Sequence, residues 1–427
     1  MKIISLTPGT GSFHCGSCIR DNTLVLALRK LGHDVLMVPL YLPFVADEDT
    51  SEGVPVFLGG VNAYLQQKSS IFRKMPKWMD RIFDSNYLLR KVSHKAGMTK
   101  ASDLGSMTVS TLKGLEGFQK KEIAHLIKFI QGKEKPDVIM ISNVLLTGLI
   151  KPLKDVVDCK VAVTLQGEDT FLDSLPEPWN KQAWNLIKKN CEHADMFFPV
   201  SHYHYKLMNA RLNLPPEKVK VVYNGLKLAE YRIGEFPLDP PVLGMLSRLI
   251  PGKGLDVLTE AYIHLRDKNL IPGLKLKVAG SKTKSEEVFI SSIQEKLRVA
   301  GYLEDVEFAY NISEEEKRDF LAALTLFSTP AEYGESFGLY VIEALACGLP
   351  VIQPDSAAFP ELLGYLDCGV MYKTGDPVHL AEQITFTFKE LEAEKAKAAK
   401  AAAKVKKEFS EEAMATAVAA HLESLFS

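Results

Sequence analysis

The chain has 427 residues, of which 46% are hydrophobic and 24% charged, and its formal net charge at pH 7 is −2. These values are typical of a soluble globular protein of two domains, and a charge so near neutrality gives no overall bias towards nucleic acid. Six cysteines in so long a chain do not form a disulfide framework. A single Lys and an early Pro8 make the N-terminus unlike a signal peptide, and no apolar run is long enough to span a membrane. We therefore expect a cytoplasmic protein.

A glycine-rich turn separates the first predicted strand from the first predicted helix. Residues 2–7 have the pattern of a buried strand, residues 19–31 that of a helix, and Gly9 and Gly11 lie between them. Folds of the α/β class bind phosphate-bearing ligands at such turns. The next glycine is Gly16, so the spacing differs from the dinucleotide pattern G-x-G-x-x-G and gives little support for NAD.

Cys15 and Cys18 open this helix as Cys-Gly-Ser-Cys. We favour a structural interpretation, in which small residues allow the helix to begin against the sheet. A redox pair ranks second, because a helix N-terminus lowers the pKa of a thiol. A metal site ranks third, because only His14 lies nearby in the sequence and no second cysteine pair exists. The acidic run at 47–49 is a solvated loop in our interpretation.

Between residues 56 and 121 the alternation of strands and helices lapses. Residues 68–121 contain twelve Lys and Arg residues against four acidic residues, with Phe, Met and Trp side chains among them. This basic insertion fits contact with an anionic acceptor or with a membrane surface, which would make the protein peripheral at an inner membrane face. A solvated helical face that covers the sheet fits equally well.

Two successive series of alternating strands and helices predict an α/β protein with two doubly wound, Rossmann-like parallel-sheet domains. The last strand of the first series is expected at 219–223, and a proline-rich linker follows it. We place an N-terminal domain at 1–235, a second domain at 236–407 and a C-terminal helix at 408–427.

The stretch 324–353 reads as strand, loop, helix and strand. Apolar residues recur at helical spacing over 339–347, and the loop before them carries Glu335. Backbone N–H groups at the start of this helix form an anion site. Glu343 lies one turn inside the helix, and two carboxylates beside an anion site suit a ligand with both hydroxyl and phosphate groups.

The run G-E-S-F-G-L-Y-V-I-E-A-L-A-C-G-L-P-V-I in this stretch resembles the donor-site motif of the retaining nucleotide-sugar glycosyltransferases of family 4, which have the GT-B fold. The resemblance is strong over 242–372 and absent over 56–121. It implies two domains facing each other across a cleft, the first on the acceptor side and the second binding the donor. It also implies a nucleotide-diphosphate sugar as donor. The acceptor is not identified, and a glycan or a lipid-linked compound is a candidate.

Two cations at the carboxyl edge of the second sheet suit the departure of a diphosphate. Arg248 ends a strand, and Lys253 lies in P-G-K-G at the start of a helix. With a helix N-terminus they stabilise the developing negative charge without a metal, so we expect no metal site and no cofactor. The segment S-R-L-I-P-G-K-G-L-D-V-L also resembles the family's diphosphate-binding segment.

The resemblance assigns further roles around the donor. Glu335 lies near the transferred sugar, and Glu343 accepts hydrogen bonds from the ribose hydroxyls. Gly9 and Gly11 approach the donor phosphates and the acceptor. The sugar and phosphates also contact the helix N-terminus at Ser336, Phe337, Gly338 and Leu339.

The first domain departs from the family at Gln166, where members commonly have His before the Gly. An amide can orient a sugar hydroxyl but cannot titrate. Retention by front-face attack needs no titrating group there, since the departing phosphate oxygen takes the acceptor's proton. We count Gln166, with Arg248, Lys253 and Glu335, as the catalytic residues.

Three other functions stay open from the sequence. The same fold serves nucleotide-sugar epimerases and phosphorylases. Gln166 in place of His fits a catalytically silent nucleotide-sugar-binding protein, and Cys15 with Cys18 fits an oxidoreductase. The base, the sugar, the acceptor and the oligomeric state are not specified.

The resemblance further implies that the last helix returns to the first domain. An apolar stripe at spacings of three and four runs from Ala413 to Leu425. We expect catalysis to need both domains closed, since closure excludes water from an activated sugar. A chain that ends after Glu408 should then bind nucleotide and lose transfer.

Overall fold

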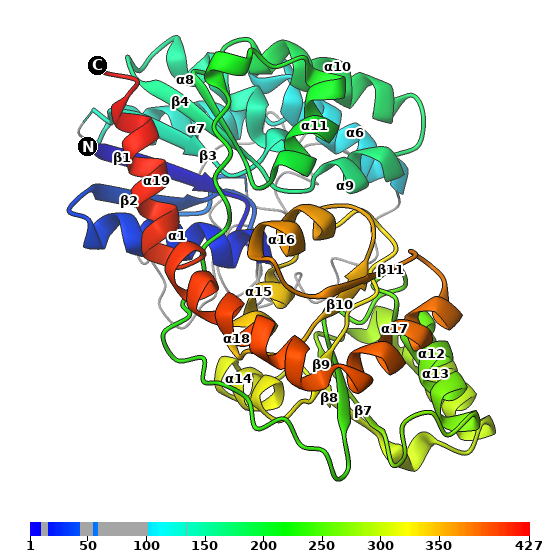
Figure 1. Ribbon diagram of the computed structural model, residues 1–427. Helices are drawn as coiled ribbons and strands as arrows, with labels where there is room; N and C mark the ends of the chain where they lie inside the picture. Colours follow the sequence, from blue (N-terminus) through cyan, green and yellow to red (C-terminus); the bar gives the residue numbers. More distant parts are fainter. Residues whose placement is uncertain (10–15, 43–53, 59–100, 134) are drawn as a thin grey trace. The chain divides into compact units, whose positions relative to one another are not determined.

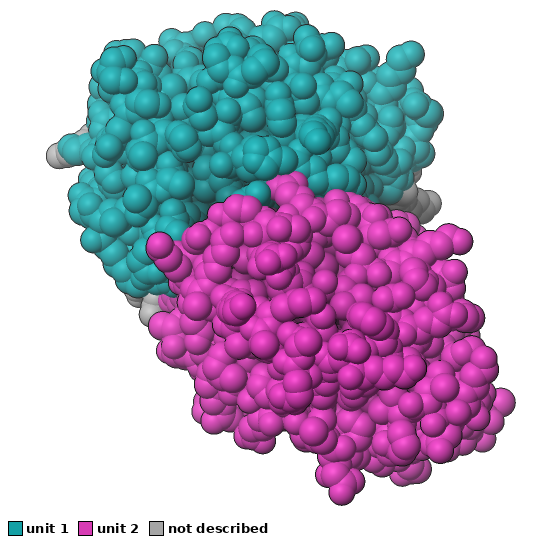
Figure 2. All heavy atoms as spheres, in the orientation of Figure 1, with its two compact units in different colours: residues 1–225, 411–427 teal, residues 226–410 magenta. Residues whose placement is uncertain are grey.

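The computed structural model describes residues 1–9, 16–42, 54–58, 101–133 and 135–427 (Figure 1). The expectations for Gly11, Cys15, the acidic run at 47–49 and most of the basic insertion lie outside these residues. The chain forms two compact units, coloured in Figure 2: unit 1 is 1–225 with 411–427, and unit 2 is 226–410. The divisions fall at 225/226 and 410/411, where the sequence suggested 235/236 and 407/408.

Unit 1 is built on a five-stranded parallel sheet with the strand order β2-β1-β3-β4-β5. Its strands read as continuous apolar runs because both faces of the sheet are buried. Successive side chains of a strand point to opposite faces of the sheet. Ile3 of β1 and Val138 of β3 pack in the core on one face, and Ile4 and Ile139 pack in the core on the other. The strands are β1 (Lys2–Thr7), β2 (Asp34–Pro39), β3 (Val138–Ile141), β4 (Lys160–Leu165) and β5 (Met196–Pro199).

Helices α1 (Gly16–Lys30) and α19 (Glu411–Glu423) lie side by side over one face of this sheet (Figure 1). The side chains of Met414, Val418 and Leu422 are buried there with apolar residues of α1. The core of the other face is closed by α6 (Ala101–Leu112), α7 (Lys120–Gln131), α8 (Ile150–Lys154), α9 (Asp169–Ser174), α10 (Trp179–Cys191) and α11 (His202–Leu212). Short 3-10 turns lie at Gly114–Glu116, Val144–Leu149 and Pro216–Lys218.

Unit 2 contains a four-stranded parallel sheet of order β8-β7-β6-β9, which a bridge between Phe327 and Val351 joins to the pair β10-β11. The strands are β6 (Val242–Leu246), β7 (Lys275–Gly280), β8 (Val306–Tyr310), β9 (Leu326–Phe327), β10 (Ile352–Pro354) and β11 (Val370–Tyr372). The helices are α12 (Leu255–Asp267), α13 (Glu287–Val299), α14 (Glu314–Ala322), α15 (Leu339–Ala346), α16 (Phe359–Leu366), α17 (Pro377–Lys389) and α18 (Leu391–Glu408), with 3-10 turns at Lys284–Glu286 and Leu303–Asp305. The alanine-rich α18 packs along α15, with Ala398, Ala402 and Val405 buried.

Two α/β units with parallel sheets confirm the predicted fold class. The strand predicted at 219–223 is wrong. That segment is extended and meets β5 in a single bridge, between Phe197 and Val219, and in two backbone hydrogen bonds, from Lys220 to Phe197 at 2.9 Å and from Val222 to Pro199 at 3.1 Å. Within the described ranges, no helix combines the length and the apolar character that crossing a bilayer requires.

Candidate functional site

A glycine-rich turn after β6 fixes the position of Lys253. Gly252 and Gly254 have φ of +83° and +78°, a left-handed conformation in which any other residue is strained. A Cβ on Gly254 would lie 1.8 Å from the carbonyl oxygen of Pro330. The carbonyl of Gly252 accepts a hydrogen bond from the N–H of Glu332 at 2.9 Å. The turn is therefore closed against the loop after β9, and Lys253 is held between the two glycines at the start of α12.

Lys253 and Glu335 form an ion pair at this carboxyl edge of the sheet. Lys253 Nζ lies 2.6 Å from Glu335 Oε2, and the two side chains are 25% and 16% exposed. The Tyr340 hydroxyl donates to the same oxygen at 3.1 Å. Burial, and after it the charge of Glu335, hold the pKa of Tyr340 well above its usual value, so the hydroxyl remains a donor. The structure thus brings together the cation expected at the diphosphate and the carboxylate expected near the sugar.

Helix α15 begins without a side-chain cap. Its N-cap is Gly338, with φ +90°, which makes no side-chain capping hydrogen bond. The first N–H groups of a helix, here including that of Leu339, have no acceptor within the helix and point out of its end. The loop before it is anchored by Phe337, whose ring centre lies 5.9 Å from that of Phe409, while Ser336 is half-buried. This helix end has the geometry of an anion site.

Arg248 lies two residues beyond β6 and is exposed at the same edge of the sheet. Its guanidinium is therefore open to solvent on the side of unit 2 that carries Lys253 and Glu335. Its predicted role at the diphosphate stays a prediction.

Glu343 is buried in α15 and has partners different from those of Glu335. The Tyr231 hydroxyl donates to Glu343 Oε1 at 2.8 Å, and Lys317 Nζ lies 2.5 Å from the same oxygen. Lys317 also pairs with Glu314 at 2.6 Å. Burial lowers the pKa of Lys317, but the two carboxylates outweigh it and the pKa is raised, so the ammonium stays charged. The role of Glu343 at a ribose stays a prediction.

In unit 1, Gln166 directly follows β4, in a loop that Glu168 and His204 fix. The Glu168 carboxylate accepts hydrogen bonds from the N–H groups of Val144 at 3.1 Å, Gln166 at 2.8 Å and Gly167 at 3.0 Å. The N–H of Gly167 also lies 3.0 Å from Nε2 of the buried His204. The backbone that presents Gln166 is therefore held from two sides.

The Gln166 side chain joins a buried polar network that begins on α1. Its Nε2 lies 3.2 Å from Asp21 Oδ1 and 2.8 Å from the carbonyl oxygen of Ser142. Asp21 also accepts hydrogen bonds from Arg20 Nη1 at 3.2 Å, from the Thr7 hydroxyl at 3.3 Å and from the Ser142 hydroxyl. Arg20 and Asp21 are 1% and 3% exposed. Burial raises the pKa of the Asp21 carboxyl, and the Arg20 charge opposes that rise.

Gly9 and Cys18 are among the described residues around the first glycine-rich turn, and the structural interpretation of Cys15 and Cys18 stays a prediction. Gly9 has φ +77°, and a Cβ there would lie 1.8 Å from the carbonyl oxygen of Leu42. Cys18 is buried, and the Thr7 hydroxyl lies 3.8 Å from its sulfur. In the parts of the chain that the structure describes, no group of three or more His, Cys, Asp or Glu side chains could hold a metal ion.

Several of these residues were not predicted from the sequence. Asp21 had a local signal, because Arg20–Thr23 is a polar run inside a helix whose neighbouring residues are apolar and buried. Glu168 had a weaker signal, in an acidic pair that begins three residues after the end of a strand. Tyr340 and Lys317 had none, since they belong to ordinary helical patterns.

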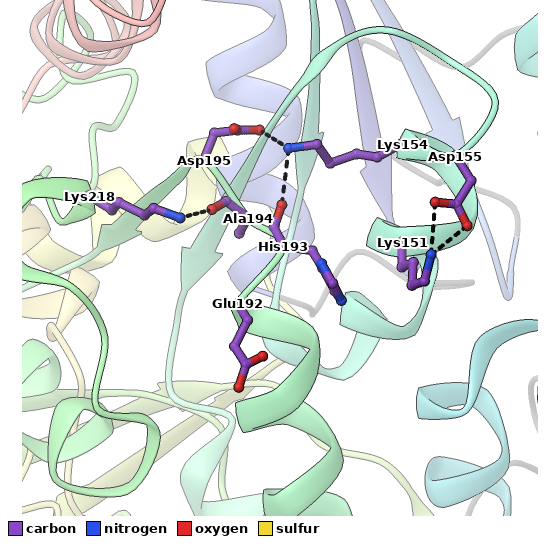
Figure 3. A pocket seen from close by; sticks show the side chains of 8 residues that line it. All are labelled: Lys151, Lys154, Asp155, Glu192, His193, Ala194, Asp195 and Lys218. Atoms are coloured by element: carbon purple, nitrogen blue, oxygen red, sulfur yellow. Dashed lines mark hydrogen bonds and ion pairs between the residues drawn. The ribbon is translucent and has the colours of Figure 1, made fainter.

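A surface hollow of about 280 Å³ lies elsewhere in unit 1 (Figure 3). It is found near the amino ends of β4 and β5, opposite the edge where Gln166 lies. Its cations already have partners: Lys154 pairs with Asp195 at 2.8 Å, and Lys218 donates to the carbonyl of Ala194 at 2.8 Å. We assign no role to it. Its lining is Lys151, Lys154, Asp155, Glu192, His193, Ala194, Asp195 and Lys218.

The chain is similar to curated glycosyltransferases over part of its length. It is 27% identical over 214 residues to the D-inositol 3-phosphate glycosyltransferase of Streptomyces bingchenggensis, covering 47% of this chain and 44% of that protein. It is 32% identical over 152 residues to the phosphatidyl-myo-inositol mannosyltransferase of Propionibacterium freudenreichii, covering 34% of each. The chain thus matches less than half the length of these relatives.

The crystal structure of Anabaena HepE in complex with UDP and glucose superimposes with a TM-score of 0.71, covering 99% of this chain and 100% of that one. At 17% sequence identity this likeness shows the fold, which confirms GT-B. The family model of glycosyl transferases group 1 matches residues 229–406, and that of glycosyltransferase family 4 matches residues 114–230. Since these adjacent matches together span 114–406, more than half of the chain, it belongs to the glycosyltransferases of group 1 and family 4.

Proposed function

We propose that the chain is a retaining glycosyltransferase that moves a sugar from a nucleotide-diphosphate sugar to an acceptor hydroxyl, with no divalent metal and no cofactor. The observation that carries this proposal is the contact of Lys253 with Glu335 beside the uncapped start of α15. One small area offers a cation and N–H groups for phosphates and a carboxylate for sugar hydroxyls. The named activities of the relatives, and the UDP and glucose held by HepE, support a nucleotide-sugar donor.

The reaction breaks the bond between the anomeric carbon and the phosphate oxygen, and forms a bond to the acceptor oxygen on the same face. Negative charge then develops on the departing diphosphate. Lys253, Arg248 and the N–H of Leu339 would stabilise that charge. The acceptor's proton passes to the departing phosphate oxygen, so Gln166 is needed to orient a sugar hydroxyl and not to titrate.

The acceptor is proposed only as a class of compound. The two relatives are named after an inositol phosphate and a phosphatidylinositol, which supports an acceptor with a free hydroxyl, either a glycan or a lipid-linked compound. We infer a cytoplasmic reaction. A membrane contact through the basic insertion is supported only by the charge of that insertion, which a solvated helical face would explain equally well. Gly9 and Gly11 keep their proposed place near donor phosphates and acceptor.

The test compares Lys253→Ala with Lys268→Ala, an exposed lysine at the opposite end of the same helix. Binding of UDP, GDP, UDP-glucose and GDP-mannose is measured by calorimetry with and without EDTA. Loss of a charge-assisted contact should weaken binding by about 1.5–3 kcal/mol in Lys253→Ala, while the control and the chelated wild type bind normally. Unchanged binding in Lys253→Ala, or wild-type binding lost on chelation, contradicts the proposal. Nucleotide release that depends on an acceptor distinguishes a transferase from a silent binding protein.

A further inference from the structure

We propose that Asp21 is a positioning residue that turns the Gln166 amide so that its carbonyl oxygen, and not its NH2 group, faces the transferred sugar. The sugar is then recognised at this point through a hydroxyl that donates a hydrogen bond. This inference rests on the proposed function, because it takes Gln166 to contact the sugar.

The orientation of the amide follows from its neighbours. Gln166 Nε2 lies 3.2 Å from Asp21 Oδ1, 2.8 Å from the Ser142 carbonyl oxygen and 3.5 Å from Ser142 Oγ. The first two atoms can only accept hydrogen bonds. Ser142 Oγ gives its single proton to Asp21 Oδ2, so it too can only accept from Gln166. Only the NH2 group fits among three acceptors, and the carbonyl oxygen of the planar amide is therefore directed away from them.

Asp21 cannot turn away from this contact, because the network fixes it from other elements. Both Arg20 and Gln166 contact its Oδ1, while the hydroxyls of Thr7 and Ser142 contact its Oδ2. Arg20 is itself held by Asn224, whose Oδ1 lies 3.1 Å from Arg20 Nε. All four groups around Asp21 are donors, which suits its carboxylate form. Contacts from several elements therefore restrict how the Asp21 carboxylate can turn.

The orientation sets a chemical preference. A carbonyl oxygen accepts a hydrogen bond from a sugar hydroxyl and repels a group that can only accept. A fluorine or a carboxylate in place of that hydroxyl should therefore be disfavoured. If the NH2 group of Gln166 faced the sugar, the preference would be reversed.

The variants separate positioning from stability. Asp21→Ala removes the partner of Gln166. Asp21→Asn keeps one oxygen for Arg20 and Gln166 and turns its NH2 group to hydroxyls that can accept. Thr7→Val is the control, since it removes a buried hydrogen bond to Asp21 without touching Gln166. We expect kcat/KM to fall roughly tenfold in Asp21→Ala, with most of the loss recovered in Asp21→Asn and little change in Thr7→Val.

The readout is discrimination between donors. UDP-glucose and GDP-mannose, with the monodeoxyfluoro analogues of whichever sugar is transferred, are compared on each variant. The wild type should disfavour fluorine at one position by roughly tenfold, the effect of one hydrogen bond, and Asp21→Ala should lose that discrimination. UDP and GDP should bind all variants equally, because the proposed nucleotide site is in unit 2. Equal discrimination in wild type and Asp21→Ala, or failure of Asp21→Asn to recover activity, overturns the inference.

A second measurement needs neither turnover nor a folded Ala variant. In wild-type protein labelled with [15N]glutamine, the side-chain NH2 protons of Gln166 should exchange slowly, because both face buried acceptors. Rapid exchange overturns the orientation of the amide. If the wild type transfers no sugar while these protons exchange slowly, the proposed function fails and the orientation stands.

Discussion

Helix α19 should be required for the stability of unit 1. The test removes it by ending the chain at Ser410. Met414, Val418 and Leu422 are at most 2% exposed, and they share a core with α1 and the sheet. Burial of each such side chain contributes about 1.5–3 kcal/mol. The three together reach roughly 5–9 kcal/mol, which is comparable with the whole unfolding free energy of a typical domain, about 5–15 kcal/mol.

Scanning calorimetry measures the outcome for each unit. The shortened chain should lose the cooperative transition of unit 1, while unit 2 unfolds near its usual temperature and still binds nucleotide. A chain ending at Glu423 is the control, because it removes only residues that are exposed or half-buried. Loss of transfer, which we expect from the sequence for a chain ending after Glu408, would then reflect an unfolded unit 1. A shortened chain whose unit 1 unfolds at the wild-type temperature would refute this reasoning.

Three further predictions concern single residues. Gly254→Ala should lose donor affinity, measured by calorimetry, and should lose more stability in urea unfolding than Gly301→Ala. Gly301 is the matched control, because its φ of +81° is similar but nothing lies within 4 Å of an added Cβ. Equal losses of stability in the two variants would mean that the close contact at Gly254 is relieved. Lys317→Met should cost about 3–5 kcal/mol in urea unfolding, because it leaves the Glu343 carboxylate buried without its cation; an unchanged midpoint would show that water replaces the lysine. The raised pKa of Asp21 means that the folded state binds this proton more tightly than the unfolded chain does, so its contribution favours folding at acid pH and is lost as the pH rises from the ordinary Asp range to the raised pKa. Urea midpoints across that range should fall less steeply in Asp21→Asn, and parallel profiles would contradict this assignment.

Local patterns were enough to predict the elements that carry the proposed donor site. Apolar spacing and a following glycine predicted a helix at 339–347, and the structure has α15 at Leu339–Ala346. The turn around Lys253 was predicted at the start of a helix, which is where it lies. These features depend on residues within a few positions of one another, so the sequence shows them directly.

Long-range contacts could not be predicted in this way. Lys253 and Glu335 are 82 positions apart, and Gln166 and Asp21 are 145 apart. The sequence of a helix can show that a polar residue such as Asp21 is unusual among buried apolar neighbours. It does not show which distant strand end the side chain of that residue contacts. The strand prediction at 219–223 failed for a related reason. The valine-rich composition of this segment suits a strand, but the segment forms a single bridge, to one neighbouring strand.

The contacts of Glu335 would allow a diphosphate to replace this carboxylate as the partner of Lys253. Lys253 and Tyr340 both contact Oε2 of Glu335, which leaves Oε1 on the other side of the carboxylate. Lys253 is a quarter exposed, so a diphosphate could draw its ammonium away at little cost in desolvation. Tyr340 would still hold Glu335 in place while Oε1 accepts a hydrogen bond from a sugar hydroxyl.

Glu343 has the same kinds of partner as Glu335, but its lysine is held more firmly. One lysine, Lys317, and one tyrosine, Tyr231, again contact a single oxygen, here Oε1. Lys317 is bonded to Glu314 as well and is more deeply placed than Lys253, so a ligand would not remove it readily. A ribose contact would therefore use Oε2 of Glu343 and leave its ion pair intact. Because the pair stays formed, the energy of binding a ribose would not include the cost of breaking it, and this carboxylate is preorganised in a way that Glu335 is not.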